Sequence, residues 1–311
     1  MGRCVLRLTA LSLAVGLLLV LGGCGGSDAD TPPPDRAPTP DGPPIRLGTK
    51  NFTEQTILGE LYRQALEAKG YDVVLKPDIG SSEIVHRALR RGALDMYPEY
   101  IGVLLSEVAQ DTDRPPSDAA AYDAAKAFER RNGFTLLAQT PFADSNALAV
   151  KPGFARRHRV STIADLRRLK GTVKIAALPE FATRFEGIKG LRKVYGLRHL
   201  TAVDAEGSAR YSMLDGGEVD VASVFTSEGQ LAGQDYVVLE DPRRVFASGH
   251  VAPVVDDDLL EAHGPGLQAA IDAVTRELTT AAMREMNGAV DLRKRRAATV
   301  AAEFLRARGL G

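Results

Sequence analysis

Short apolar runs alternate with segments of helical periodicity along most of the 311-residue chain, and this alternation restricts the fold more than any other feature. In the first unit, Ile45–Thr49 predicts a strand, and apolar residues then recur at helical spacing from Ile57 to Leu66. Alternating strands and helices indicate an α/β fold with mainly parallel sheets that are covered by helices. The other predicted strands are Tyr71–Leu75, Leu94–Tyr97, Thr135–Ala138, Ala147–Lys151, Val173–Ala177, Val219–Phe225, Tyr236–Leu239 and Val251–Val255.

Helices are predicted over Ser82–Arg91, which stops at Gly92, and over the chain from Asp257 to its end. The last helical stretch, Leu292–Leu305, is basic and amphipathic. We interpret its run of four cations as the solvated face of a helix, in preference to a membrane-binding patch; the run is Arg293, Lys294, Arg295 and Arg296. The chain length allows about two domains.

The N-terminus predicts an export signal. Arg3 and Arg7 flank the apolar run Leu8–Leu21, which ends in Gly-Gly and Cys24. This ending resembles the bacterial lipobox, which implies that residues 1–24 are a lipoprotein signal and that Cys24 is the lipid attachment point. A short transmembrane helix is the alternative, and the run is slightly shorter than the roughly 18 to 20 residues that a span needs. We therefore expect a lipid anchor on the outer face of the bacterial cytoplasmic membrane.

Residues 25–44 are rich in proline and small polar residues and lack apolar periodicity, so we expect a flexible tether between the anchor and the folded body. The two cysteines of the chain, Cys4 and Cys24, both precede this tether. The folded body therefore contains no thiol, and a disulfide scaffold is excluded.

Composition and motifs argue against two broad classes of function. With 39 basic and 40 acidic residues, the chain has no overall field that would favour nucleic acid or an anionic membrane. Nucleophile elbows, phosphate-binding loops and complete dinucleotide fingerprints are missing, and the five histidines lack metal-ligand spacing. We therefore expect neither an enzyme nor a metal or cofactor site, although an enzyme remains the first alternative from another class.

An internal sequence similarity predicts two similar halves. The segment Leu89–Tyr100 aligns without gaps on Leu214–Phe225. In each, a helix end is followed by a glycine, Gly92 or Gly217, then by a strand that carries Asp and ends in an aromatic residue eight positions after the glycine. Ligands of open α/β sheets bind outside the carboxyl ends of strands. The two terminal aromatics are therefore predicted to face each other across a cleft, unless each is a separate core or surface residue.

Five short motifs carry a family resemblance: Gly48–Gln55, Asp95–Tyr100, Asn146–Val150, Glu180–Arg184 and Ala252–Val255. Together they resemble the substrate-binding proteins of osmoprotectant ABC importers, which bind glycine betaine, choline and carnitine. The resemblance extends from about Arg46 to beyond Val300. It is carried most specifically by the first two motifs.

The resemblance implies an α/β, two-lobed class II periplasmic-binding-protein fold with a central cleft and two hinge crossovers. Lobe one would comprise residues 45–145 plus 251–311, and lobe two residues 146–250. Closure would bury a quaternary ammonium zwitterion in a box of tyrosines and create the surface that an ABC permease recognises. The protein would then deliver its solute to that permease and its ATPase subunit.

At the carboxylate end of the ligand, the resemblance implies contacts from Lys50 and from Arg184, whose planar guanidinium suits a bidentate carboxylate. Val103 stands where the family has a threonine near the carboxylate. Asp144 matches a position that contributes a main-chain contact. The alternative for Lys50 or Arg184 taken alone is a solvated surface charge.

At the cation end, the sequence departs from the family pattern. Tyr100 matches one box tyrosine and Phe225 stands at a second, but Asn146 and Gly249 occupy the positions of the other two. Each lost cation–π contact removes about 0.5 to 2 kcal/mol. Gly249 is expected to open volume and Asn146 to add an amide, which leaves three possibilities: weak betaine binding, a larger polar or aromatic solute, or a box refilled by Phe142, Tyr211 or His250. A solute sensor with the same clamp is a further alternative.

Overall fold

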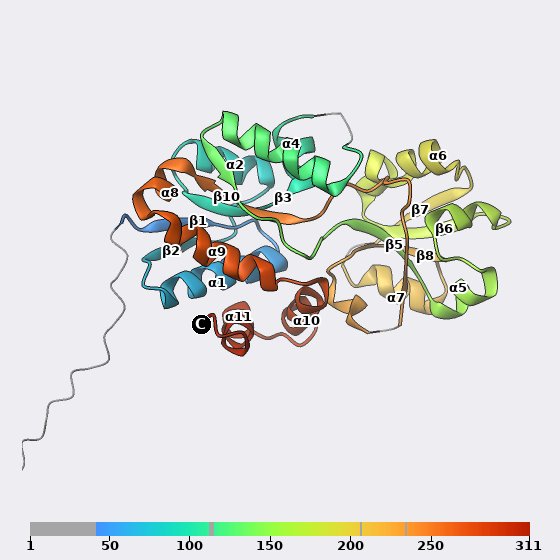
Figure 1. Ribbon diagram of the computed structural model, residues 1–311. Coiled ribbons are helices and arrows are strands. Elements are labelled where there is room, and N and C mark those ends of the chain that lie inside the picture. The colour runs from blue at the N-terminus through green and yellow to red at the C-terminus, as the bar shows by residue number, and fades with distance from the viewer. Residues whose placement is uncertain (1–41, 112–114, 206, 234) are drawn as a thin grey trace, which may run out of the picture. The chain divides into compact units, whose positions relative to one another are not determined.

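The computed structural model describes residues 42–311 except 112–114, 206 and 234, and it contains two five-stranded sheets (Figure 1). The first sheet has the strand order β2-β1-β3-β10-β4 and the second has the order β7-β6-β8-β5-β9. The strands are β1 (Ile45–Gly48), β2 (Val73–Lys76), β3 (Met96–Tyr100), β4 (Phe134–Leu136), β5 (Asn146–Val150), β6 (Val173–Ala177), β7 (Leu200–Asp204), β8 (Val221–Phe225), β9 (Val237–Leu239) and β10 (Val251–Asp256). The anchor, Cys24 and nearly all of the predicted tether lie outside the described residues.

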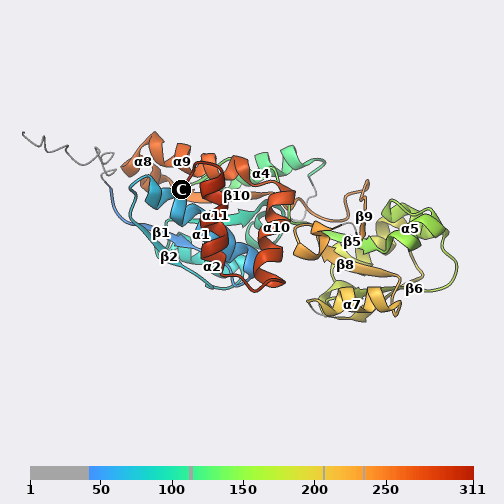
Figure 2. The same ribbon diagram turned by 90° about the horizontal axis from the view of Figure 1, so that it is seen from below.

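Helices cover both faces of the first sheet, because its strands are apolar on both sides. On one face, side chains from β1, β3 and β10 pack with α1 (Thr53–Ala68), α8 (Asp257–His263), α9 (Pro265–Glu277), α10 (Thr280–Asp291) and α11 (Ala297–Ala307). The other face packs against α2 (Ser82–Arg90), α3 (Ile101–Val103), the π-helical turn η1 (Leu104–Val108) and α4 (Asp118–Arg131). Figure 2 shows α1, α10 and α11 side by side.

The second sheet is also a central layer. Its larger core lies against the short helices η2 (Ile163–Arg168), η3 (Pro179–Ala182), η4 (Phe185–Lys189) and α6 (Gly190–Tyr195), with α5 (Pro152–His158) at its edge. The opposite face packs against α7 (Ala209–Gly216), and η5 (Gly229–Ala232) follows β8. Each sheet is therefore the middle of three layers, as the alternating sequence pattern predicted.

The prediction of mainly parallel sheets is wrong for half of the strand pairs. In the first sheet β1 pairs in parallel with β2 and β3, but β10 is antiparallel to both β3 and β4. In the second sheet β6 pairs in parallel with β7 and β8, but β5 is antiparallel to both β8 and β9. The two strands that run antiparallel to both of their neighbours, β5 and β10, directly follow a segment that crosses from one sheet to the other. Each arrives from the other sheet, so no helical crossover fixes its direction.

The basic run near the C-terminus is not on a helix, so that prediction is wrong. Arg293–Arg296 lies in the exposed connection between α10 and α11, where Lys294 has a positive φ of 55°. Arg293 and Arg295 form ion pairs with Glu285 and Glu303, both at 2.5 Å. Within the described residues, no helix is long and apolar enough to cross a membrane.

The two similar segments, Leu89–Tyr100 and Leu214–Phe225, fold alike. Gly92 and Gly217 both end a helix with a left-handed φ, 65° and 74°, a conformation that glycine adopts without steric cost. The aspartates that follow also act alike: Asp95 accepts the backbone N–H of Arg46 at 2.7 Å, and Asp220 accepts that of Lys174 at 3.0 Å. Each aspartate thus accepts a hydrogen bond from the start of the parallel strand that lies beside its own strand. The aromatic residues end β3 and β8, as the alignment predicted.

A buried group of ionisable side chains lies between α2 and α4. His86 Nδ1 is 3.6 Å from Glu129 Oε1 and 3.1 Å from the Tyr97 hydroxyl. Burial, reinforced by Glu99 and opposed by Arg90, raises the pKa of Glu129 to about 8. Burial, reinforced by Arg90, lowers the pKa of His86 to about 4. Both groups are therefore mainly uncharged near neutral pH, which limits the cost of enclosing them.

These shifts predict how stability depends on pH. The pKa of Glu129 rises from 4.5 to about 8 on folding, so its contribution is present below pH 4.5 and lost as the pH rises toward 8. The pKa of His86 falls from 6.5 to about 4, so its contribution is present above pH 6.5 and lost as the pH falls toward 4. Between pH 6.5 and 8, Glu129 is therefore the member of this pair that titrates.

We expect Glu129→Gln to remove part of the decline in unfolding free energy between pH 6.5 and 8, because glutamine has no proton to lose. Urea unfolding of both proteins across this range measures the effect. The exposed Glu261→Gln variant is the control and keeps the wild-type slope. Parallel pH profiles for Glu129→Gln and wild type would contradict the prediction.

Candidate functional site

The two segments that connect the sheets run side by side. One joins β4 to β5 and the other joins β9 to β10. Ala143 and His250 form an isolated antiparallel bridge between them, and the Asp144 N–H donates to the Gly249 carbonyl at 2.9 Å. Ser145 Oγ also donates to the Ala247 carbonyl at 3.1 Å. The two connections therefore pair with each other and are called the paired hinge below; β5 continues from it into the second sheet and β10 into the first.

Gly249 is buried in this hinge, and the expectation that it opens volume is wrong. A Cβ atom built on Gly249 would lie 2.2 Å from the Asp144 carbonyl oxygen and 2.6 Å from the Ser145 nitrogen. The space beside its Cα atom is thus filled by backbone. Gly249 permits this close approach of two chains, which any side chain would prevent.

Lys50 follows β1 and is buried, with 3% of its surface exposed. Its ammonium group forms an ion pair with Glu99 and donates to Ser82 Oγ at 2.7 Å. It also lies 4.4 Å from the centroid of the Tyr100 ring. Burial lowers the pKa of Lys50, while the charge of Glu99 acts in the opposite direction. Its role as a ligand contact stays a prediction, and its charge is already balanced within the first sheet.

Tyr100 ends β3 and belongs to a polar network that connects the two sheets. Its hydroxyl donates to Glu54 at 2.7 Å, and the amide of Asn287 donates to the other oxygen of Glu54 at 2.8 Å. The same amide donates to the Ser227 carbonyl, just after β8, at 2.9 Å. Arg284, one turn earlier on α10, donates to the Thr226 carbonyl at 2.7 Å. Helix α10 of the first sheet thus holds the chain that leaves β8.

Asp144 adds a second acid to this region. The N–H of Ser227 lies 3.4 Å from Asp144 Oδ1, a long contact. Burial, reinforced by the charge of Glu54, raises the pKa of Asp144 well above its ordinary value. Burial also raises the pKa of Glu54, against the hydrogen bonds that it accepts from Ser227, Asn287 and Tyr100. The charge of Glu54 thus opposes the ionisation of Asp144, in addition to the effect of burial.

Asn146 and Phe225 lie directly opposite each other on β5 and β8, so their side chains project from the same face of the second sheet. Both are half-buried. The Asn146 amide donates to Glu186 Oε2 at 2.9 Å, and the other oxygen of Glu186 accepts the Ala247 N–H at 3.2 Å. Arg210 lies 5.7 Å from the centroid of the Phe225 ring. This face therefore combines an aromatic ring, an amide and a carboxylate.

Arg184 is exposed and directly precedes η4, two residues before Glu186. The turn that carries both is tight, since a Cβ atom on Gly187 would lie 2.0 Å from the Phe181 carbonyl oxygen. One short turn thus carries a cation and an anion that are two residues apart in the sequence. Val103 is half-buried and packs against the core of the first sheet.

A depression of about 220 Å³ lies at the hinge, and Asn146, Gly249 and His250 line it together with Thr226 and Ala247. The structure thus brings together Asn146, Gly249 and the neighbours of Asp144 and Phe225. Within the residues that the structure describes, no group of three or more potential ligands is arranged to hold a metal ion.

The residues proposed to refill the aromatic box already have packing or hydrogen-bond partners. Phe142 is fully buried in the core of the first sheet. The Tyr211 hydroxyl donates to Glu228, and His250 Nδ1 lies 2.9 Å from the carbonyls of both Thr140 and Phe142. For Phe142, refilling the box is therefore incompatible with its place in the core.

Sequence reasoning missed Glu54, Asn287 and Glu186. Glu54 lies inside the first recognised motif, and Glu186 lies two residues beyond the fourth, so their positions gave a signal that was not used. Asn287 gave none, because a single polar residue on a predicted helix is most often solvent-exposed.

Comparison with known proteins decides the family. Residues 43–307 match the family described as the substrate binding domain of ABC-type glycine betaine transport system. The chain belongs to this family. The glycine-betaine-binding protein of Pseudomonas aeruginosa is 31% identical over 274 residues, which cover 84% of this chain and 87% of that protein. The glycine betaine-binding protein YehZ of Escherichia coli is 27% identical over 278 residues, 86% of this chain and 91% of that protein.

The fold agrees with this membership. A crystal structure described as a glycine betaine/carnitine/choline ABC transporter superposes with a TM-score of 0.79 at 24% identity, over 86% of this chain and 99% of that one. The expected α/β fold of the substrate-binding proteins is therefore confirmed, as is the family that the five motifs indicated.

The hinge contact makes a direct prediction. We expect Gly249→Ala to lower the free energy of unfolding by about 1 to 3 kcal/mol, because the added methyl group meets backbone that no rotamer change can move. Gly153→Ala in α5 is the control, since nothing lies within 4 Å of its Cβ position. Chemical denaturation measures both variants. Equal stability of Gly249→Ala and wild type would show that the hinge opens readily at this point.

Proposed function

We propose that this protein is an extracytoplasmic solute-binding protein that delivers a betaine-like solute to an ABC importer. The family match over residues 43–307 is the observation that carries the proposal. The proposal includes a lipid anchor at Cys24, a permease with its ATPase subunit as partner, and no catalysis. A sensor with the same clamp would differ in its partner and would share the site.

We infer that the two sheets, with their helices, are two lobes that close on the solute about the paired hinge. Residues 45–145 plus 251–311 would form lobe one, and residues 146–250 lobe two. Few polar contacts join α10 to the chain after β8, which supports this division. When the lobes move, two or three hydrogen bonds can be replaced by hydrogen bonds to water at low cost.

The carboxylate of Glu186, which accepts the Ala247 N–H near the hinge, supports a cationic ligand head. Glu186 is held by Asn146, whose partner across the strands is Phe225. A carboxylate about 4 Å from a quaternary ammonium group contributes about 4 kcal/mol of attraction at an effective dielectric of about 20, before desolvation. That is as large as the upper end of the roughly 1 to 4 kcal/mol lost with two aromatic contacts of about 0.5 to 2 kcal/mol each. Glu186 therefore offsets the incomplete aromatic box.

Arg184 is the group proposed to hold the carboxylate of the solute. Arg184 and Glu186 come from one tight turn, which therefore carries both of the charges that a zwitterion needs as partners. Lys50 would act indirectly through Tyr100, since its ammonium group is already paired with Glu99. Within lobe one, Tyr100 and Val103 remain the proposed contacts, and Asp144 and Gly249 would contribute backbone at the hinge.

Titration calorimetry with glycine betaine, carnitine and choline tests the function and the role of Arg184. We expect Arg184→Ala to weaken glycine betaine binding about 10- to 100-fold, since a charge-assisted hydrogen bond is lost, and to weaken choline binding much less, since choline has no carboxylate. Arg167→Ala, an exposed arginine on η2, is the control. Absence of binding of all three solutes to the wild type would contradict the proposed solute class, and equal losses for betaine and choline would remove Arg184 from the carboxylate end.

A second prediction concerns Glu186. We expect Glu186→Gln to weaken glycine betaine binding about tenfold, because the amide keeps the hydrogen-bonding shape but loses the charge. The carbon analogue, in which a tert-butyl group replaces the trimethylammonium group, has no positive charge and should bind both proteins alike. Glu218→Gln, an exposed glutamate before β8, is the control. The same loss for both ligands would indicate a structural role for Glu186 instead.

A further inference from the structure

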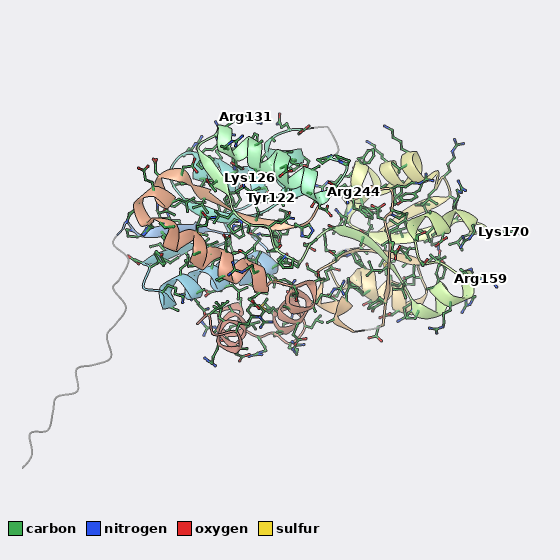
Figure 3. All side chains as sticks on the ribbon, viewed as in Figure 1. Tyr122, Lys126, Arg131, Arg159, Lys170 and Arg244 are labelled. Carbon is green, nitrogen blue, oxygen red and sulfur yellow. The ribbon has the colours of Figure 1, made fainter. Side chains whose placement is uncertain are left out.

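A second, larger depression lies at the other end of the second sheet. Its volume is about 850 Å³, and its polar lining comes from the end of α5, the end of η2 and the residues at the start of β6 and β8. The charged and ionisable residues among its lining are Arg157, His158, Arg159, Arg168, Lys170 and Asp220. Figure 3 labels Arg159 and Lys170 on this part of the molecule.

This basic depression is separate from the candidate solute site. It adjoins Val173 and Asp220, where β6 and the chain into β8 begin, whereas Phe225 stands at the carboxyl end of β8. A five-residue strand spans about 15 Å, at about 3.3 Å per residue. The two regions therefore lie at opposite ends of the same parallel strands, and occupation of one leaves the other open.

The charge of the depression departs from that of the whole chain, which carries 39 basic and 40 acidic residues. Four exposed cations line it against one aspartate, Asp220, whose carboxylate accepts the Lys174 N–H at 3.0 Å. Among the described residues, Arg157, Arg159 and Lys170 form no ion pair with an acidic side chain. A concave surface with an excess of one charge concentrates ligands of the other sign.

Part of this surface is held in place by the fold. Arg168 is bound on both sides, by Asp165 at 2.8 Å and by the Arg159 carbonyl at 2.7 Å. Hydrogen bonds from the backbone of Ser161 and Thr162 lower the pKa of Asp165 to about 2, so this partner stays charged. Arg159 has a φ of 54°, a left-handed conformation that costs energy in any residue with a side chain. The contacts of Arg168 thus tie this loop to η2, and its arginines line the depression.

We propose that the basic depression binds a phosphate ester. Arginine guanidinium groups pair bidentately with phosphate oxygens, and the apolar side chains of Phe154 and Leu169 in the same lining suit the organic part of such a ligand. The phosphate ester is carried either by a phospholipid headgroup or by a soluble molecule. This site is independent of the solute that the hinge region binds.

The test uses the full chain carrying Cys24→Ser, so that no acyl chain at residue 24 brings it to a membrane. Binding to phosphatidylglycerol vesicles is measured by co-sedimentation against phosphatidylcholine vesicles, and binding of glycerol phosphate by titration. We expect Arg159→Glu/Lys170→Glu to lower affinity for the phosphate ester at least about tenfold, since two attractive charges become repulsive. Arg157→Glu/Lys170→Glu, which leaves the strained position unchanged, should give the same loss.

Arg130→Glu/Arg131→Glu is the matched control, because it makes the same change of charge on two exposed arginines of α4, of which Figure 3 labels Arg131. Selective binding to the phosphatidylglycerol vesicles supports the site and assigns it to lipid, and binding of glycerol phosphate without vesicle binding supports it and assigns it to a soluble ester. Binding of neither probe overturns the proposal. Equal losses in the α4 control and the two depression variants also overturn it, since the effect would then reflect net charge alone.

Discussion

The contact of Gly249 with the backbone of Asp144 is the constraint on which the rest of the structure depends. It brings the two connecting segments close enough to pair, through the Ala143–His250 bridge and the hydrogen bond from Asp144 to Gly249. Strands β5 and β10 start from this paired hinge and run antiparallel to their neighbours. Asn146 is only two residues from the hinge. Because the hinge connects the two sheets, it also sets the position of the proposed contacts in one sheet relative to those in the other.

A second contact between the sheets is made of small residues and a few polar groups. A Cβ atom on Gly229 would lie 2.4 Å from the Cα atom of Gly288, so η5 and α10 touch backbone to backbone. Beside this contact, Asn287 joins the Ser227 carbonyl to Glu54, which also accepts the Tyr100 hydroxyl. A rearrangement of the sheets would change this network before it disturbed either core, because each core is built within its own sheet. The end of β3 and the end of β8 are coupled in this way.

Much of the fold follows from local sequence, and the errors have physical causes. The strand Val173–Ala177 was predicted with its observed ends, because four of its five residues are apolar and buried and only Lys174 is exposed. Strand β7, Leu200–Asp204, was missed because four of its five residues are only partly buried or exposed and the apolar signal is weak. The direction of β5 and β10 depends on the hinge, which joins residues about 100 positions apart and leaves no local pattern. The similar helix ends at Gly92 and Gly217 were predictable, since a left-handed helix end has a clear sequence signal.

The candidate site was also predictable only where local sequence determines it. Motifs identified Lys50 and Asn146, but not the roles of their partners Glu99 and Glu186, because ion pairs and hydrogen bonds between distant residues depend on tertiary structure. The motifs also suggested space at Gly249, where the structure has backbone from another segment. A missing side chain therefore signals either an opening or a close contact, and sequence alone does not distinguish them.

The central claim is that two halves close on a solute about the paired hinge. The distance between spin labels at Lys126→Cys in α4 and Arg156→Cys in α5 tests it most directly, in a chain whose two native cysteines, Cys4 and Cys24, are replaced by serine. Pulsed dipolar spectroscopy with saturating glycine betaine should show a shorter and narrower distance distribution than without it. An unchanged distribution, with binding of the solute established on the same sample, would contradict the account.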